Sequence, residues 1–210
     1  AAGRRHGSAA MRCAVSTRWN ASRHRDGEAM IGELLELGFT RVELGYDLTR
    51  DLVPGVLSMV SSHAVSISSV HSYCPVPMGA PRGHPELFLP AARDRRMREG
   101  AVKHLAETIR FAARAGARTV VCHAGYAPMG RRSKRLLHLL SRAGSKDDPR
   151  YRRALERAWR LRDRRAPGAL DRLRNTLDQL LPVLERHNVQ LALENLPSLE
   201  SLPSEREVLP

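Results

Sequence analysis

Five short β-prone runs alternate with amphipathic helical stretches along the chain, and this alternation constrains the fold more than any other feature. The β-prone runs are residues 12–17, 41–44, 65–70, 118–122 and 189–193. Apolar residues recur at helical spacing between them, at about 26–37, 52–63, 93–115 and 170–187. This order predicts an α/β fold made of parallel βα units with right-handed crossovers.

Two architectures contain such units, the open doubly wound sheet and the TIM-type barrel. No predicted strand is followed by a G-x-G-x-x-G or P-loop sequence, so the usual nucleotide-binding signature of the doubly wound sheet is missing. Each strand instead ends in a polar or aromatic residue that can line a shared mouth. We therefore predict a TIM (β/α)8-type barrel.

The length modifies this prediction. A complete barrel of this type has about 250 residues, whereas the chain has 210. Ser204 and Glu207 have the S-x-x-E spacing of a capping box, which predicts a helix start close to Pro210. We expect a barrel truncated after the fifth strand over residues 11–210, preceded by a disordered leader or foreign residues at 1–10.

The positive charge is concentrated in one segment. The formal net charge is +13, and 32 of the 35 basic residues are arginine. Residues 131–165 hold 14 basic and 4 acidic residues, the first twelve residues add three arginines, and the remainder holds 18 of each sign. We interpret residues 128–167 as an Arg-rich helical insertion, a solvated hairpin serving as a lid or oligomer contact, in preference to a DNA-binding surface.

The sequence favours a cytoplasmic protein. Cys13, Cys74 and Cys122 form no C-x-x-C pair, which argues against a disulfide framework or a zinc knuckle. Residues 1–10 lack the apolar core of a secretory signal. No apolar run approaches the roughly 18 to 20 residues of a membrane span.

Catalytic groups of a TIM barrel lie at the carboxyl ends of its strands. The residues at the predicted strand ends are Trp19, Glu43, Tyr46, His71, His123 and Glu194. Two imidazoles and a carboxylate are suitable ligands for a divalent ion. Glu194 is the strongest candidate, because a carboxylate directly after an apolar strand is costly unless it is paired or bound to metal.

Each candidate also has a plainer interpretation. A single histidine at a strand end is more often a hydrogen-bonded loop residue than a ligand. Glu43 can simply pair with an arginine, and Trp19 can cap the barrel floor or pack against the first helix. Two such histidines on adjacent strands, followed by an acid on the next strand, make the metal interpretation more favourable.

Three strings, SSVHSYCP, VVCHAGYAPM and LALENLP, occur in this order and together resemble the xylose isomerase-like TIM-barrel superfamily. That group contains sugar phosphate isomerases and epimerases, and endonuclease IV of abasic-site repair. The Glu194-Asn195 pair is the most specific element, and the resemblance implies that Glu194 is a metal ligand. The endonuclease branch would make His71 and His123 zinc ligands, whereas the isomerase branch more often uses these positions to contact substrate.

The resemblance implies a metal-dependent isomerase or epimerase acting on a sugar, sugar phosphate or related polyol through an enediolate or hydride shift. The cofactor would be a divalent ion (Zn²⁺, Mn²⁺, Mg²⁺ or Co²⁺), with Glu194 as ligand and catalytic base. Trp19, Glu43, His71 and His123 would contact the substrate. The family's other ligands lie on strands six to eight, so the chain alone is expected to bind metal poorly. No phosphate cradle is evident.

Two alternatives remain open at this point. An endonuclease IV-like nuclease would need a three-metal cluster and a basic groove for a bent duplex, but the body is neutral and has only 4% aromatic residues. A non-catalytic barrel scaffold would have lost its metal. The expected partners are a small-molecule carbohydrate and a second copy of the chain in a homo-oligomer, with neither nucleic acid nor membrane.

Overall fold

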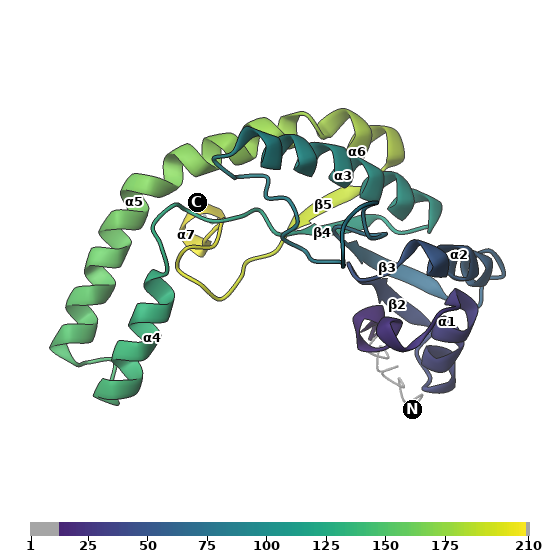
Figure 1. The fold of residues 1–210 in the computed structure, drawn as a ribbon, viewed down its shortest axis with the longest axis horizontal. Coiled ribbons are helices and arrows are strands. Elements are labelled where there is room, and N and C mark those ends of the chain that lie inside the picture. The colour runs from purple at the N-terminus through teal and green to yellow at the C-terminus, as the bar shows by residue number, and fades with distance from the viewer. Residues whose placement is uncertain (1–12, 209–210) are drawn as a thin grey trace, which may run out of the picture.

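The computed structural model describes residues 13–208, in which a five-stranded sheet has the order β1-β2-β3-β4-β5 (Figure 1). The strands are β1 (Val15–Ser16), β2 (Arg41–Leu44), β3 (Ser66–His71), β4 (Thr119–Cys122) and β5 (Gln190–Leu193). All neighbouring strands are parallel. A doubly wound sheet reverses its strand order at a switch point, whereas consecutive order is that of a TIM barrel. The predicted fold class is confirmed. The predicted leader at 1–10 lies outside the described residues.

The helices are α1 (Gly27–Glu36), α2 (Val53–Ser61), α3 (Arg95–Arg114), α4 (Arg132–Ala143), α5 (Pro149–Asp178), α6 (Leu181–His187) and α7 (Glu205–Val208). The predicted ends of the first three helices and of β2 to β5 agree with the structure to within two residues. Asp26 and Asp94 cap α1 and α3, because each carboxylate accepts a hydrogen bond from a backbone N–H of the first turn.

The first strand is shorter than the sequence predicts. Only Val15–Ser16 pairs with β2, and Thr17–Trp19 turns into a 3-10 helix. The side chains explain the change, since the Ser16 hydroxyl accepts a hydrogen bond from the Arg18 N–H. Such local side-chain bonds compete with a sheet ladder. The Thr17 hydroxyl then ties this turn to β2 by accepting from the Gly45 N–H at 2.9 Å.

Helices cover one face of the sheet, as expected for right-handed crossovers that all advance in the same direction. Val42 and Val120 are fully buried in a core that includes Leu34 of α1 and Leu105 of α3. Residues that alternate with them, among them Glu43, are only partly buried. Because successive side chains point to opposite faces, this second face corresponds to the interior of a barrel.

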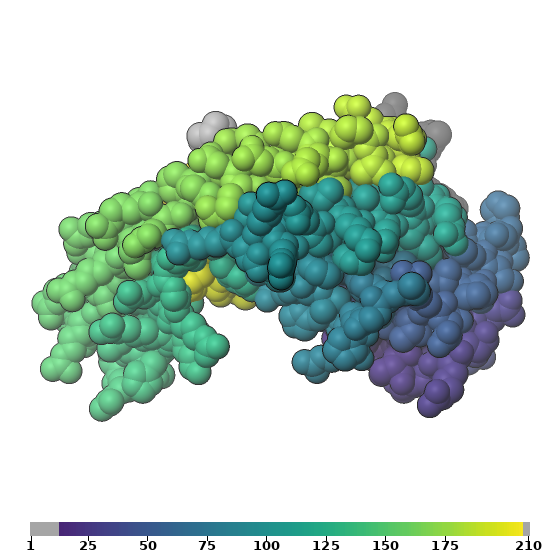
Figure 2. All heavy atoms as spheres, turned by 45° about the horizontal axis from the view of Figure 1, so that its top comes forward, coloured from purple at the N-terminus to yellow at the C-terminus, as the bar shows by residue number. Residues whose placement is uncertain are grey.

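Helices α4 and α5 form a hairpin that extends away from the sheet in Figure 1. Figure 2 shows the two helices as a lobe beside the body of the molecule. A second hydrophobic cluster lies beneath them and joins the insertion to the loops after β4 and β5. It consists of Ala91, Ala124, Ala127, Met129, Leu136, Ala158, Ala166, Ala169, Leu173 and Leu202. The insertion is therefore packed against the loops at the carboxyl edge of the sheet.

The predicted helix at 170–187 is wrong in its boundaries. Helix α5 begins at Pro149 within the insertion and continues through Pro167 to Asp178, and α6 follows as a separate helix. A proline inside a helix removes one backbone hydrogen bond and usually ends or bends the helix. Here the buried residues Arg162 and Ala169 lie on either side of Pro167, so tertiary packing outweighs the break. Figure 1 shows α5 curving along its length.

Two of the three cysteines are buried. Cys13, Cys74 and Cys122 are free. Burial raises the pKa of the Cys122 thiol to about 12, and that of Cys74 is also raised by burial, so both thiols stay protonated and unreactive. In the part of the chain that the structure describes, none of the helices has the length and apolarity needed to cross a bilayer.

Candidate metal centre

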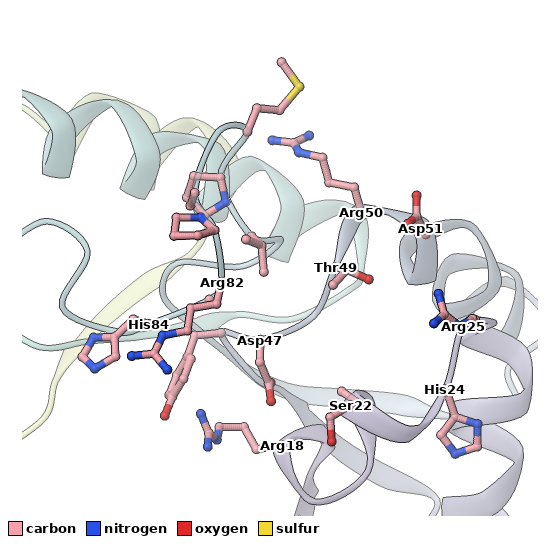
Figure 3. A pocket seen from close by; sticks show the side chains of 18 of the residues that line it. Arg18, Ser22, His24, Arg25, Asp47, Thr49, Arg50, Asp51, Arg82 and His84 are labelled. Atoms are coloured by element: carbon pink, nitrogen blue, oxygen red, sulfur yellow. The ribbon is translucent and has the colours of Figure 1, made fainter.

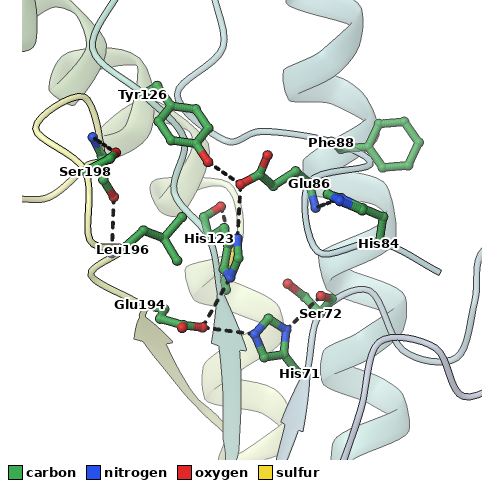
Figure 4. Close-up of polar contacts among 12 residues, drawn as sticks. His71, Ser72, His84, Glu86, Phe88, His123, Tyr126, Glu194, Leu196 and Ser198 are labelled. Atoms are coloured by element: carbon green, nitrogen blue, oxygen red, sulfur yellow. Dashed lines mark hydrogen bonds and ion pairs between the residues drawn. The ribbon is translucent and has the colours of Figure 1, made fainter. Parts of the chain in front are cut away.

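The three predicted ligands meet at the carboxyl edge of the sheet (Figure 4). His71 ends β3, His123 follows β4 and Glu194 follows β5. The Glu194 Oε2 atom lies 3.0 Å from His71 Nε2 and 3.2 Å from His123 Nε2. One carboxylate oxygen thus faces both imidazoles, although the three residues are far apart in the sequence.

Hydrogen bonds at the opposite ring nitrogens orient both imidazoles. His71 Nδ1 donates to the Ser72 carbonyl at 3.0 Å, and His123 Nδ1 faces Glu86 Oε1 at 3.4 Å. A neutral imidazole carries one proton, so protonation at Nδ1 leaves a lone pair on each Nε2. Two nitrogen lone pairs and a carboxylate oxygen then point at one another, an arrangement that repels unless a cation or proton lies between them.

The two carboxylate–imidazole distances match those around a divalent cation, and the three candidate ligand atoms all lie within 4.8 Å of one another. Metal–ligand bonds of about 2.1 Å at octahedral or tetrahedral angles separate neighbouring ligand atoms by about 3.0 to 3.4 Å. The two distances to Glu194 Oε2 are 3.0 and 3.2 Å. The imidazoles are 11% and 10% exposed, whereas the Glu194 side chain is 42% exposed. The centre is therefore enclosed on the histidine side and open to solvent on the carboxylate side.

Glu86 and Tyr126 support His123, and the sequence analysis missed both. The Tyr126 hydroxyl donates a hydrogen bond to the Glu86 oxygen that faces His123. Burial, together with this hydrogen bond, raises the pKa of Tyr126 above its ordinary range, so the phenol remains a donor. One signal was available in the sequence, because Glu86 is the single acidic residue of the long loop 72–92.

The remaining predicted site residues lie further from the two histidines. Glu43 lies on β2 and accepts a hydrogen bond from the Ser69 hydroxyl at 2.9 Å. Trp19 is 51% exposed, and the Arg23 guanidinium lies 4.3 Å from its ring centroid. The arginine covers one face of the indole, which leaves only the opposite face for a sugar. Substrate contact by either residue stays a prediction.

Tyr46 connects the centre to the neighbouring loops. Its ring lies edge-on to the His71 imidazole, with the centroids 5.2 Å apart. On the ring, the Arg18 guanidinium carbon lies 4.1 Å from the centroid. This is a cation–π contact. Because Tyr46 in turn contacts His71, one aromatic ring separates the Arg18 charge from a candidate ligand.

A consecutive parallel sheet with helices on one face defines the TIM-barrel class of folds. The family model described as "Xylose isomerase-like TIM barrel" matches residues 31–207. The chain belongs to this family, which confirms the resemblance carried by the three strand-end strings. No curated protein sequence matches the chain.

Solved structures of sugar epimerases share the fold. A D-tagatose 3-epimerase-like protein is 18% identical with a TM-score of 0.58, and the match covers 90% of this chain and 54% of that one. The 3-keto-D-glucoside 4-epimerase from E. coli is 13% identical with a TM-score of 0.57, and the match covers 91% of this chain and 59% of that one. An L-ribulose 3-epimerase is 14% identical with a TM-score of 0.54, and the match covers 90% of this chain and 50% of that one. The chain thus spans between half and three-fifths of these proteins, and at such identities the likeness shows the fold alone.

Proposed function

We propose that the protein is a metal-dependent isomerase or epimerase of a carbohydrate, with His71, His123 and Glu194 as metal ligands. The observation that carries this proposal is the single Glu194 oxygen shared by two imidazoles whose Nδ1 atoms are already hydrogen-bonded. Membership of the xylose isomerase-like family supports the reaction class. The epimerases among the structural neighbours are consistent with it.

At the carbonyl end of the sugar, different residues of the chain would hold the cation, move the proton and orient His123. A bound divalent cation would supply a Lewis acid that polarises the carbonyl. Glu194, open to solvent on one side, acts as a positioned general base: it removes the proton from the carbon beside the carbonyl and, for an isomerisation, delivers it to the former carbonyl carbon. An epimerisation would need a second acid to protonate the opposite face. His71 and His123 would hold the cation beside Glu194 through their Nε2 lone pairs. Glu86 and Tyr126 keep His123 in the tautomer that directs its Nε2 lone pair inward.

Metal binding is the first test. We expect the purified protein to bind one equivalent of Zn²⁺ or Mn²⁺ with low affinity, because it supplies three ligands; competition with a chromophoric chelator measures the binding. His71→Ala and Glu194→Gln should each weaken binding at least about tenfold, because each removes one ligand. His138→Ala is the matched control, since His138 is an exposed histidine on α4. Unchanged affinity in both ligand variants would refute the centre.

Turnover is the second test. The metal-loaded protein, incubated in D₂O with a panel of aldoses and ketoses, should incorporate deuterium at the carbon beside the carbonyl if an enediolate forms. Isomerised product without deuterium would indicate a hydride shift. Binding of three zinc ions with cleavage of an abasic duplex would replace this proposal with a nuclease. Metal binding without any turnover would favour the scaffold alternative.

A further inference from the structure

A cavity of about 1290 Å³ opens next to the candidate metal centre. Its walls come from the turn after β1, the segment after β2 and the long loop after β3 (Figure 3). These segments all follow the carboxyl ends of their strands, the edge where TIM-barrel enzymes bind their substrates. The cavity is therefore in the position of a substrate pocket.

Arginines dominate the charge of this pocket. Its lining includes five arginines but only two acidic residues, Asp47 and Asp51. Arg23 pairs with Glu33 at 2.7 Å. The other four are Arg18, Arg25, Arg50 and Arg82, and none of them has a carboxylate partner within 4.0 Å among residues 13–208. Guanidinium groups gathered in one cavity without anionic partners repel one another, so an anionic ligand would stabilise them.

The loop 82–86 joins this pocket to the metal centre. Arg82 and His84 line the pocket, and Glu86 contacts His123. His84 Nδ1 accepts a hydrogen bond from the Glu86 N–H at 3.0 Å, which leaves the proton on Nε2 and makes that atom a donor. Figure 3 shows Arg18 and Arg82 at the end of the pocket nearest His84, and Figure 4 shows His84 beside Glu86.

Two glycines allow the close approach that builds this end of the pocket. A Cβ at Gly83 would lie 2.1 Å from the Tyr46 carbonyl oxygen, and one at Gly45 would lie 2.4 Å from Arg18 Cγ. Both distances are far below a van der Waals contact. Arg18 is held further by its position over the Tyr46 ring. Arg18 is therefore packed against the backbone at Gly45, and the backbone at Gly83, next to Arg82, is packed against that of Tyr46.

Asp47 adds a hydrogen-bond acceptor to the cations. Its Oδ1 atom is buried and has no hydrogen-bond partner, and a buried acceptor without a partner is costly. A ligand that carries hydroxyl groups beside its anionic group would satisfy both the arginines and this carboxylate.

We propose that this pocket binds the phosphate group of a phosphorylated sugar whose carbonyl end lies at the candidate metal centre. The placement of the carbonyl end rests on the proposed function, whereas the anion site rests on the arginines alone. A nucleic-acid backbone is less suitable, because the four unpaired arginines, all of them exposed, line one cavity and the rest of the body is neutral. Arg18 and Arg82 hold the phosphate, and Asp47 accepts a sugar hydroxyl.

Calorimetric titration of the 210-residue protein with ribose 5-phosphate, ribose and inorganic phosphate tests this assignment. We expect ribose 5-phosphate to bind more tightly than inorganic phosphate, and ribose to bind at least about a hundredfold more weakly. Arg18→Gln and Arg82→Gln should each weaken ribose 5-phosphate binding about tenfold, the value of one charge-assisted hydrogen bond. Arg118→Gln is the control, because Arg118 is exposed just before the amino end of β4, at the opposite edge of the sheet.

The outcomes separate this inference from the proposed function. Glu194→Gln should lose metal affinity but keep its affinity for inorganic phosphate. If it does, and the metal-loaded wild type shows no turnover, the anion site stands while the isomerase proposal fails. Equal affinity of wild type and both arginine variants, or equal affinity for ribose and ribose 5-phosphate, would overturn the anion site. An abasic duplex that binds more tightly and loses this affinity in the same variants would assign the pocket to nucleic acid.

Discussion

At the scale of single residues, the geometry of His123 depends on a carboxylate that does not face the metal position. Glu86 Oε1 accepts a hydrogen bond from the Tyr126 hydroxyl and lies 3.4 Å from His123 Nδ1. Carboxylates in this position fix the tautomer and the ring orientation of a ligating histidine and increase its basicity. The loop that carries Glu86 is thus coupled directly to the candidate ligand set.

Replacement of Glu86 by alanine should therefore weaken metal binding although Glu86 is not a ligand. We expect a loss of about 10- to 100-fold in Zn²⁺ affinity, measured by chelator competition. Tyr126→Phe should cause a smaller loss, because the carboxylate remains. Glu99→Ala serves as the control, since Glu99 is exposed on α3 and pairs only with Arg95. Identical affinity of the Glu86 and Glu99 variants would show that His123 needs no outer partner.

The sequence predicts the inner residues of this centre better than their supports. His71, His123 and Glu194 each directly end or follow an apolar strand, and parallel strand ends converge whatever the loops do. Glu86 and Tyr126 lie on loops, where contacts depend on tertiary path and leave no periodic signal. The pocket arginines were missed for the same reason, because Arg18 and Arg82 come from different loops.

At the scale of elements, the insertion organises the segment that follows β5. Glu200 is buried and accepts hydrogen bonds from the Ser133 backbone N–H and hydroxyl, at 2.7 and 2.5 Å, near the start of α4. Arg162 of α5 is 2% exposed, and its guanidinium donates to both carboxylate oxygens of Glu207. The loop that begins at Glu194 is therefore held between α4 and α5, which gives the insertion a structural role beyond that of a solvated hairpin.

Arg162→Ala should release this segment. Removal of one partner from a buried ion pair costs about 3 to 5 kcal/mol, so we expect local opening of residues 195–207. In hydrogen–deuterium exchange, the Leu202 amide, which donates to the Gly125 carbonyl, should exchange at least about tenfold faster. Arg160→Ala is the matched control on the same helix, because Arg160 is exposed and pairs only with Glu156. Equal exchange in both variants would contradict the role of Arg162.

The elements themselves were predictable to different degrees. β-prone runs and helical periodicity located β2 to β5 and α1 to α3. The division of 149–187 into helices was not predictable, because Pro167 and Gly168 are local break signals that burial overrides. The S-x-x-E spacing did indicate α7, where the Ser204 N–H donates to the Glu207 carboxylate at 2.6 Å.

At the scale of the whole molecule, the sheet has an open side. Among residues 13–208, β5 pairs with β4 along one edge only. An apolar cavity of about 450 Å³ lies next to it, lined mainly by leucines of α5, α6 and β5. Leu181 is 48% exposed there. An unpaired strand edge beside exposed apolar side chains is a surface on which another chain can pair.

We therefore expect the 210-residue protein to self-associate through this edge, in line with the predicted homo-oligomer. Leu181→Lys and Leu191→Lys should each weaken the association at least about tenfold, because each places a charge in the apolar contact. Leu137→Lys is the control, since Leu137 is 66% exposed but lies on α4 in the insertion. Sedimentation velocity over a range of protein concentrations measures the effect. A protein that stays monomeric at every concentration would contradict the prediction, and association that only Leu137→Lys disrupts would transfer the interface to the insertion.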